Sequence, residues 1–238
     1  MLGNGNVNIA ANNQLQLGNE IRADGNLALS SQQGDVVAQS VFANDSVGIS
    51  SHGNIDVQTV QAANDLALSA STGQITAQSL LAGRDLGLRA QDRIQLQGDA
   101  GAGRNASIQS AQAGVQAGNL SAGNDLTVLA AQAIQVAGGA SAGGDLALSS
   151  QNAGVSAQTL LANGDLSTQA AGDIIIAGTV AAGGNNQLHS SAGQVDLGAD
   201  LYGANSVSVI GNSVQLAQGL QSGGLASVTA NTGAIHSA

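Results

Sequence analysis

The chain has 238 residues, 34 of them Gly, with no Cys, no Pro and only 1% aromatic residues. Only 8% of residues are charged, the five cations are all Arg, and the formal net charge is -10. This balance argues against nucleic-acid binding and anionic membrane surfaces, because both require a basic patch. Without Cys there is neither a disulfide framework nor a thiolate metal site. No apolar run is long enough for a membrane-spanning helix, so we expect no membrane insertion.

A twenty-residue repeat organises the whole chain. Residues 122–141 and 142–161 each open with Ala-Gly-X-Asp, followed by an apolar pair spaced by one residue, Leu126 with Val128 and Leu146 with Leu148. A fixed period of this length is typical of a stacked-repeat fold. We place twelve unit starts, 19 to 21 residues apart, at Gly3, Ala23, Ala43, Ala62, Ala82, Ala102, Ala122, Ala142, Ala162, Ala182, Gly203 and Ser222. No gap interrupts them, so we predict a single domain over residues 1–238.

After its opening turn, each unit contains a predicted strand that carries two apolar positions. The sixth residue after each start is a branched aliphatic in eleven of twelve units, Thr168 being the exception. The residue two places earlier is also mainly apolar, as at Leu66, Leu86 and Leu126, although Asn186 occupies it once. Small or polar residues such as Ser107 lie between the two positions. This alternation predicts strands with one buried face.

Two further apolar segments complete each unit. The second alternates like the first, as in Ile55 with Val57 and Ile134 with Val136. The third is shorter and recurs at positions such as Ile21, Val41, Leu80, Leu120, Leu160, Val180 and Leu201. Three short strands in every twenty residues predict an all-β chain that coils so that equivalent strands stack in parallel. We therefore predict a three-faced parallel β-helix, or β-solenoid, of about twelve coils.

Stacking is energetically necessary in such a fold. One unit buries roughly five aliphatic side chains, each contributing about 1.5 to 3 kcal/mol. Ordering twenty residues of backbone costs about 1 to 2 kcal/mol per residue, so a single coil is unstable alone. Hydrogen bonds and side-chain contacts between coils offset the difference, and stability is cooperative along the axis. Twelve coils at about 4.8 Å each predict a rod on the order of 55 Å long.

The predicted turns carry the main candidate site. Their first two residues are mostly Gly, Asn, Asp, Ala or Arg, types suited to turns and, for Gly and Asn, to positive φ. The third is a short side-chain acceptor, which we expect to bond a nearby backbone N–H in an Asx-type turn and to stack into a ladder. The ladder residues are Asn6, Asn26, Ser46, Asp65, Asp85, Asn105, Asp125, Asp145, Asp165, Asn185 and Ser206. Turn capping is the favoured interpretation, and a calcium ladder of stacked carboxylates is the alternative.

No other group of residues predicts a catalytic, cofactor-binding or metal site. His52, His189 and His236 lie at different phases of the repeat and are expected to face solvent. Arg84 and Arg104 share a phase in adjacent coils, where Asp65, Asp85 and Asp125 are expected to surround and balance them; a small carboxylate or sulfate site is the alternative.

The sequence predicts a protein without enzymatic activity. The only glutamate is Glu20, which leaves no partner for paired-glutamate hydrolysis. Phe42 and Tyr202 are the only aromatics, and no exposed apolar or aromatic patch is evident. We therefore predict no cofactor, and neither a catalytic nor a metal site.

The phrase Ala-Gly-Gly-Asp-Leu-X-Leu at residues 142–148, with Ala-Gly-Asp-Ile at 171–174, resembles the haemagglutinin repeats of filamentous-haemagglutinin-like exoproteins. That family comprises large two-partner-secretion proteins of Gram-negative bacteria, including adhesins and contact-dependent growth inhibition effectors. The resemblance implies a right-handed parallel β-helix, exported through an outer-membrane secretion partner and displayed at the cell surface as part of a longer exoprotein.

Three functions are consistent with that resemblance. The favoured one is a structural shaft that projects a distal binding or toxin module. In the second, the segment itself adheres to host cells, glycans or neighbouring bacteria through its polar faces. The third is self-association in biofilm, end to end, through the open β-edges of the solenoid. An exposed apolar or aromatic patch would favour adhesion over the shaft.

Overall fold

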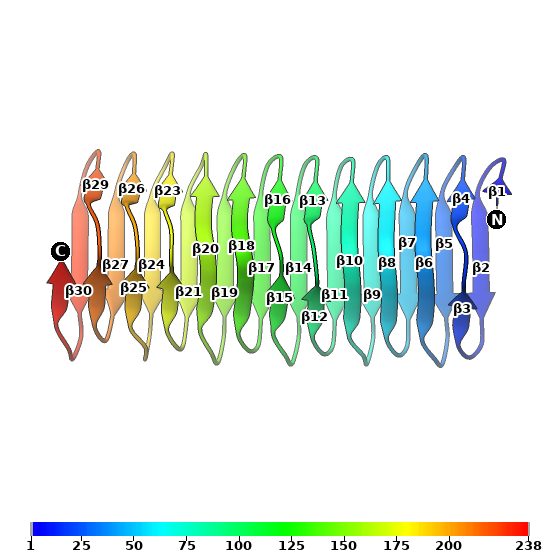
Figure 1. Cartoon of the computed structure of the whole chain (residues 1–238), viewed down its shortest axis with the longest axis horizontal. Helices are drawn as coiled ribbons and strands as arrows, with labels where there is room; N and C mark the ends of the chain where they lie inside the picture. The colour runs from blue at the N-terminus through cyan, green and yellow to red at the C-terminus, as the bar shows by residue number, and fades with distance from the viewer. Residues whose placement is uncertain (1, 238) are drawn as a thin grey trace.

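The computed structural model of the chain describes residues 2–237 and contains strands and turns but no helix in that range. All of its strand pairings are parallel, and they stack as a β-solenoid of about twelve turns of roughly twenty residues (Figure 1). The predicted fold class is confirmed. No helix in the described range is long and apolar enough to cross a membrane.

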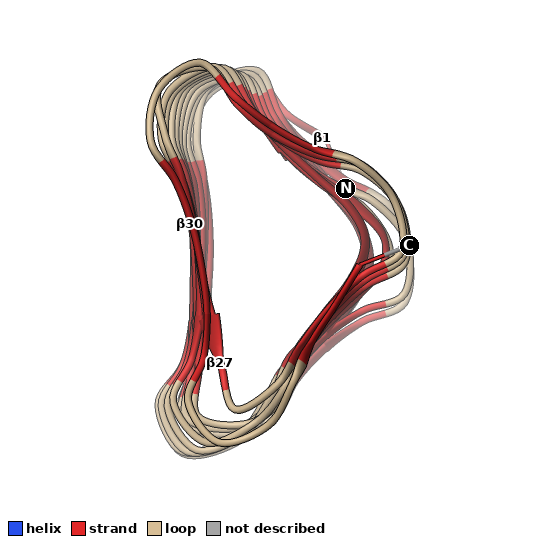
Figure 2. Cartoon of the chain, turned by 90° about the vertical axis from the view of Figure 1, so that its left-hand side faces the viewer, coloured by secondary structure: helices blue, strands red, loops and turns tan. Residues whose placement is uncertain are grey.

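Viewed along its axis, the stack has a triangular outline with three flat faces (Figure 2). Face 1 is a separate 12-stranded sheet. Its strands are β2 (Val7–Ala11), β5 (Leu27–Ser31), β7 (Val47–Ser51), β9 (Leu66–Ala70), β11 (Leu86–Ala90), β14 (Ala106–Ser110), β17 (Leu126–Ala130), β19 (Leu146–Ser150), β21 (Leu166–Ala170), β24 (Asn186–Ser190), β27 (Val207–Gly211) and β30 (Ala226–Ala230).

Faces 2 and 3 belong to one 19-stranded sheet that bends at the corner between them. Face 2 contains β3 (Leu15–Leu17), β12 (Ile94–Leu96), β15 (Val115–Ala117), β22 (Ile174–Ile176), β25 (Val195–Leu197), β28 (Val214–Leu216) and β31 (Ile235–Ser237). Face 3 contains β1 (Leu2–Gly3), β4 (Ile21–Ala23), β13 (Ala100–Ala102), β16 (Leu120–Ala122), β23 (Val180–Ala182), β26 (Leu201–Gly203) and β29 (Leu220–Ser222). Five longer strands run through the corner and join the two faces: β6 (Val36–Ala43), β8 (Ile55–Ala62), β10 (Ile75–Ala82), β18 (Ile134–Ala142) and β20 (Val155–Ala162).

The register places equivalent residues of successive units directly above one another. On face 1, Leu66 pairs with Leu86, which pairs with Ala106. On face 2, Ile55 pairs with Ile75. The repeat period therefore sets the register, because a shift by one residue would turn every apolar side chain of a strand outwards.

The core is a column of small and branched aliphatic side chains. Most units contribute the two apolar positions of face 1, the alternating pair of face 2 and the single aliphatic of face 3, as the sequence predicts. The alanine at the start of most units is buried as well, for example Ala62 and Ala82. Aromatic residues are absent from this core among the described residues, because neighbouring coils leave room only for aliphatic layers.

One prediction about the turns is wrong. No residue among 2–237 has a positive φ, so the turn glycines are not required for a left-handed backbone. Where they occur, they permit close stacking instead: a Cβ on Gly123 would lie 2.1 Å from the carbonyl oxygen of Gly103, and one on Gly143 would lie 2.0 Å from that of Gly123. Glycine therefore relieves crowding from the coil below and is not needed for the backbone of its own turn.

Candidate functional site

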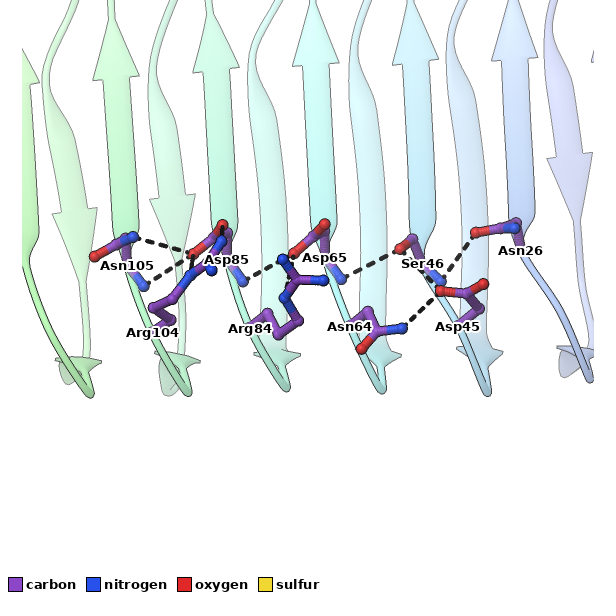
Figure 3. A network of polar contacts seen from close by, with 9 residues as sticks. All are labelled: Asn26, Asp45, Ser46, Asn64, Asp65, Arg84, Asp85, Arg104 and Asn105. Carbon is purple, nitrogen blue, oxygen red and sulfur yellow. Dashed lines mark hydrogen bonds and ion pairs between the residues drawn. The ribbon is translucent and has the colours of Figure 1, made fainter.

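The predicted side-chain ladder lies along the corner between faces 3 and 1. Its residues occupy the last position of the turn, directly before each face 1 strand, so parallel stacking brings them into one line. Nine of the described residues around this line are drawn in Figure 3, which shows the side chains pointing along the stack from one coil to the next.

Nine of the eleven ladder side chains, from Asn6 to Asp165, accept a hydrogen bond from the backbone N–H of the equivalent residue one coil later. Asn26 N donates to Asn6 Oδ1 over 2.8 Å. Asp145 N donates to Asp125 Oδ1 over 2.9 Å, and Asp165 N donates to Asp145 Oδ1 over 2.8 Å. The same bond to the preceding ladder side chain is donated by the backbone N–H groups of Ser46, Asp65, Asp85, Asn105, Asp125 and Asn185. The expected ladder is present, but its bonds join two coils and do not close an Asx turn within one coil.

This connection explains why Asp, Asn and Ser interchange along the ladder. An N–H donor requires only an oxygen at the right height, and all three residue types supply one. Ser206 continues the line through its hydroxyl, which donates to Asn185 Oδ1 over 2.7 Å. The next position is Leu225, an aliphatic that cannot accept, and the ladder ends there.

Arginine neutralises two carboxylates near the middle of the ladder. The Arg104 guanidinium donates to both carboxylate oxygens of Asp85, and Arg84 lies 3.8 Å from Asp65 (Figure 3). The Arg104 hydrogen bonds, together with the Asn105 N–H, hold the pKa of Asp85 well below its ordinary value. Each arginine pairs with the preceding coil, so the expected place of Asp125 in this cluster is wrong: within residues 2–237 Asp125 forms no ion pair.

The ladder does not assemble a metal site in the described part of the chain. Residues 2–237 contain no group of three His, Asp or Glu side chains that could hold an ion. Asp125, Asp145 and Asp165 are exposed, and one oxygen of each already accepts a backbone N–H. The three histidines are exposed and far apart in the stack, as the sequence predicts.

A second polar column lies inside the core and was not predicted. At the end of several face 1 strands a buried serine replaces the usual alanine and donates to a turn carbonyl of the preceding coil. Ser51 Oγ donates to Gly34 O over 2.6 Å, and Ser150 Oγ to Gln132 O over 2.9 Å. The Ser/Ala alternation at that position was the available signal. It indicates a site where a small side chain is needed and a hydroxyl can be satisfied.

Several large apolar side chains that the sequence analysis did not single out are exposed, although they do not form a continuous patch. Both aromatics and two exposed leucines occupy one outward column on face 3, at the residue before the unit start. Leu81 is 49% exposed, Leu161 43% and Tyr202 42%, while Phe42 is half-buried beneath the Arg22 guanidinium. The signal was missed because each of these residues lies 39 to 80 positions from the next in sequence.

Comparison with protein-family models, with curated proteins and with solved structures finds no match to this chain. A proposal for the function of this chain therefore depends on the geometry of the stack and on the sequence resemblance alone.

Proposed function

We propose that this chain is a structural shaft in a secreted, surface-displayed filamentous exoprotein, where it separates a distal binding or toxin module from the cell. The observation that carries this proposal is the uninterrupted stack. Each unit from Gly3 to Ser222 repeats the same three faces and short turns, without an inserted loop. A rod of constant cross-section supplies length and stiffness, which is what a spacer requires.

The surface chemistry supports the same role. Outward positions are mainly Ser, Thr, Gln, Asn, Ala and Gly, and charged side chains are sparse. Such a surface offers few buried polar anchors for a small ligand. The sequence resemblance to haemagglutinin repeats supports export through an outer-membrane partner and cell-surface localisation. No chemistry in this proposal requires a cofactor or catalytic residue.

The shaft and the adhesive alternative differ in a direct binding experiment. The labelled chain would be titrated against epithelial cells, Gram-negative bacteria and a glycan array. The shaft predicts no saturable binding to any of them. Saturable binding to one, competed by unlabelled chain, would contradict the shaft and identify an adhesive segment.

A coil deletion tests the spacer property itself. Removing residues 102–141 deletes two whole repeats and joins Gly101 to Ala142, which is equivalent to Ala102 in the face 3 strands β13 and β18. The register is preserved, so we expect a folded rod shorter by about 10 Å in small-angle scattering. Removing residues 102–131 is the matched control, because it breaks the repeat phase and should disrupt folding. If the chain without residues 102–141 is unfolded as well, the repeats do not stack as interchangeable modules and the proposal is contradicted.

A further inference from the structure

The outward column of face 3 has a symmetry that the repeat itself does not explain. Strand pairing places its residues in one line: Arg22, Phe42, Gln61, Leu81, Gly101, Ser121, Ser141, Leu161, Ala181, Tyr202 and Gln221. Counted from Ser121, Leu81 and Leu161 lie two coils away on either side. Phe42 and Tyr202 lie four coils away on either side. The large apolar residues thus form a palindrome centred on Ser121.

A palindromic column is the pattern that a two-fold interface requires. When two copies meet through the same face about an axis that crosses the stack at Ser121, each residue faces its mirror position in the column. Leu81 then lies opposite Leu161 of the second copy, and Phe42 lies opposite its Tyr202. We propose that face 3 is a self-association surface on which two copies of this chain pair side by side, with their axes antiparallel.

The shape of the column fits this pairing. The central residues Gly101, Ser121 and Ser141 are small, so two copies can approach closely where the axis passes. A shallow hollow lies beside Leu81, lined by Gln61, Leu81, Gly101 and Ser121. In the antiparallel register this hollow receives Leu161 of the second copy. Aromatic and aliphatic side chains at both ends of the column extend the contact.

At two levels of the neighbouring corner opposite charges meet in the same register, while Arg84 and Arg104 also pair with Asp65 and Asp85 of their own copy and Asp125 meets its own equivalent. The corner that borders face 3 carries Arg84 beside Leu81 and Arg104 beside Gly101. It carries the exposed carboxylates Asp145 beside Ser141 and Asp165 beside Leu161. The antiparallel register sets Arg84 at the level of Asp165 of the second copy and Arg104 at the level of Asp145. A parallel pairing would bring each apolar residue opposite itself and would set this corner against the other edge of face 3 in the second copy, away from its carboxylates.

The interface is small, and this sets the expected strength. From Phe42 to Tyr202 the column covers eight coil spacings, about 38 Å, and the face with its rims is about 15 Å wide. The buried area is roughly 600 Å² per copy, below the about 800 Å² per partner of a standard interface. We therefore expect a weak dimer that is populated at high local concentration, as on a crowded cell surface.

Sedimentation equilibrium from roughly 10 µM to 1 mM measures the dimer. Leu81→Ser with Leu161→Ser should weaken dimerisation at least tenfold, because each replacement introduces the residue already found at Ser121. The matched control is Leu129→Ser with Ile175→Ser, which removes similarly exposed side chains, 41% and 42%, from faces 1 and 2. The control should leave dimerisation unchanged. A chain that stays monomeric throughout, or a dimer that survives the face 3 variant, would overturn the proposal; the latter indicates end-to-end stacking.

Single cysteines test the antiparallel register, since the chain has none of its own. With a short bismaleimide, Ser121→Cys should crosslink to itself across the two-fold axis. Gln61→Cys should not, because its copies lie about 29 Å apart, six coil spacings. Mixed with Ala181→Cys, however, Gln61→Cys should form the crosslinked heterodimer. Self-crosslinking of Gln61→Cys would indicate parallel pairing, and no crosslinking of Ser121→Cys would exclude this face; either result overturns the proposal.

Discussion

The interior of the stack is apolar at β9 and β11 but polar at β21 and β24. The inward pairs of the first two strands are Leu66 with Leu68 and Leu86 with Leu88, all nearly inaccessible. The inward pair is Leu166 with Thr168 in β21 and Asn186 with Leu188 in β24, so each strand has one inward polar residue. Thr168 and Asn186 are both 0% exposed. Thr168 Oγ1 and Asn186 Oδ1 find no hydrogen-bond partner among residues 2–237, although Asn186 Nδ2 donates to the carbonyl of Tyr202.

This difference shows that a strand of a solenoid can keep the regular backbone register and still lower the stability of its coil. The backbone ladder continues through β21 and β24 with unchanged register. A buried polar atom without a partner nevertheless costs about 1 to 3 kcal/mol. Because each coil is stabilised mainly by its neighbours, the cost stays local. We infer that coils containing β21 and β24 are the weakest internal part of the rod.

The largest expected effect comes from moving the polar defect into the regular region. Leu66→Asn removes a buried aliphatic and introduces an amide between Val47 and Leu86, so we expect a loss of about 3 to 5 kcal/mol. Urea unfolding measures this change. The control Ser69→Asn places the same amide on the outer side of β9 and should change stability by less than about 0.5 kcal/mol. A Leu66→Asn variant as stable as the control would contradict the account of the core.

Repairing the defect should stabilise the chain. Thr168→Val keeps the shape of the side chain and removes the unpaired hydroxyl, so we expect a gain of about 1 to 2 kcal/mol. The control is Thr127→Val at an outward position of β17, where little change is expected. Loss of stability in Thr168→Val would show that the hydroxyl is satisfied in solution.

The ladder at the corner should show a smaller and partner-specific effect. Asp145→Ala deprives Asp165 N of its acceptor, so we expect a loss of about 1 kcal/mol. Asp145→Asn retains an acceptor and removes repulsion from Asp125 and Asp165, so it should equal or exceed the wild type in thermal unfolding. If Asp145→Ala and Asp145→Asn unfold at the same temperature, the ladder hydrogen bond contributes nothing to stability.

Acid should reveal how much the Arg104–Asp85 ion pair contributes to the stability of the folded chain. The folded-state pKa of Asp85 lies below its ordinary value. Its contribution is therefore fully present above the unfolded pKa of about 3.9 and is lost as pH falls from there towards the folded pKa. Because both side chains are partly exposed, solvent screening keeps this contribution small. Arg104→Gln should flatten the pH dependence of stability below about pH 4, and an unchanged profile would contradict this assignment.

The smallest expected effect is that of calcium. One oxygen of each stacked Asp is bonded to a backbone N–H, so about 1 mM calcium should leave the melting temperature unchanged. Magnesium at the same concentration controls for ionic strength. A calcium-specific rise of several degrees would establish the metal ladder instead.

The sequence predicts the fold because its information is periodic. The spacing of Leu66, Leu86 and Leu126 fixes the stacked columns, and the substitutions Thr168 and Asn186 are visible as exceptions. Whether their polar atoms find partners depends on what lies across the core, such as the Tyr202 carbonyl, and no pattern within one unit states this. The face 3 column was missed for a similar reason, since its members come from distant repeats and combine only after stacking.

Amide hydrogen exchange of the native chain compares the two regions most directly. Among the face 1 strands, β21 is as far from the C-terminal end of the stack as β9 is from the N-terminal end, and β24 corresponds to β7 in the same way. Fraying from the ends therefore affects both pairs equally. We predict faster exchange in β21 and β24 than in β9 and β7, with the difference abolished in β21 by Thr168→Val. Equal protection, or slower exchange in β21 and β24, would contradict the account.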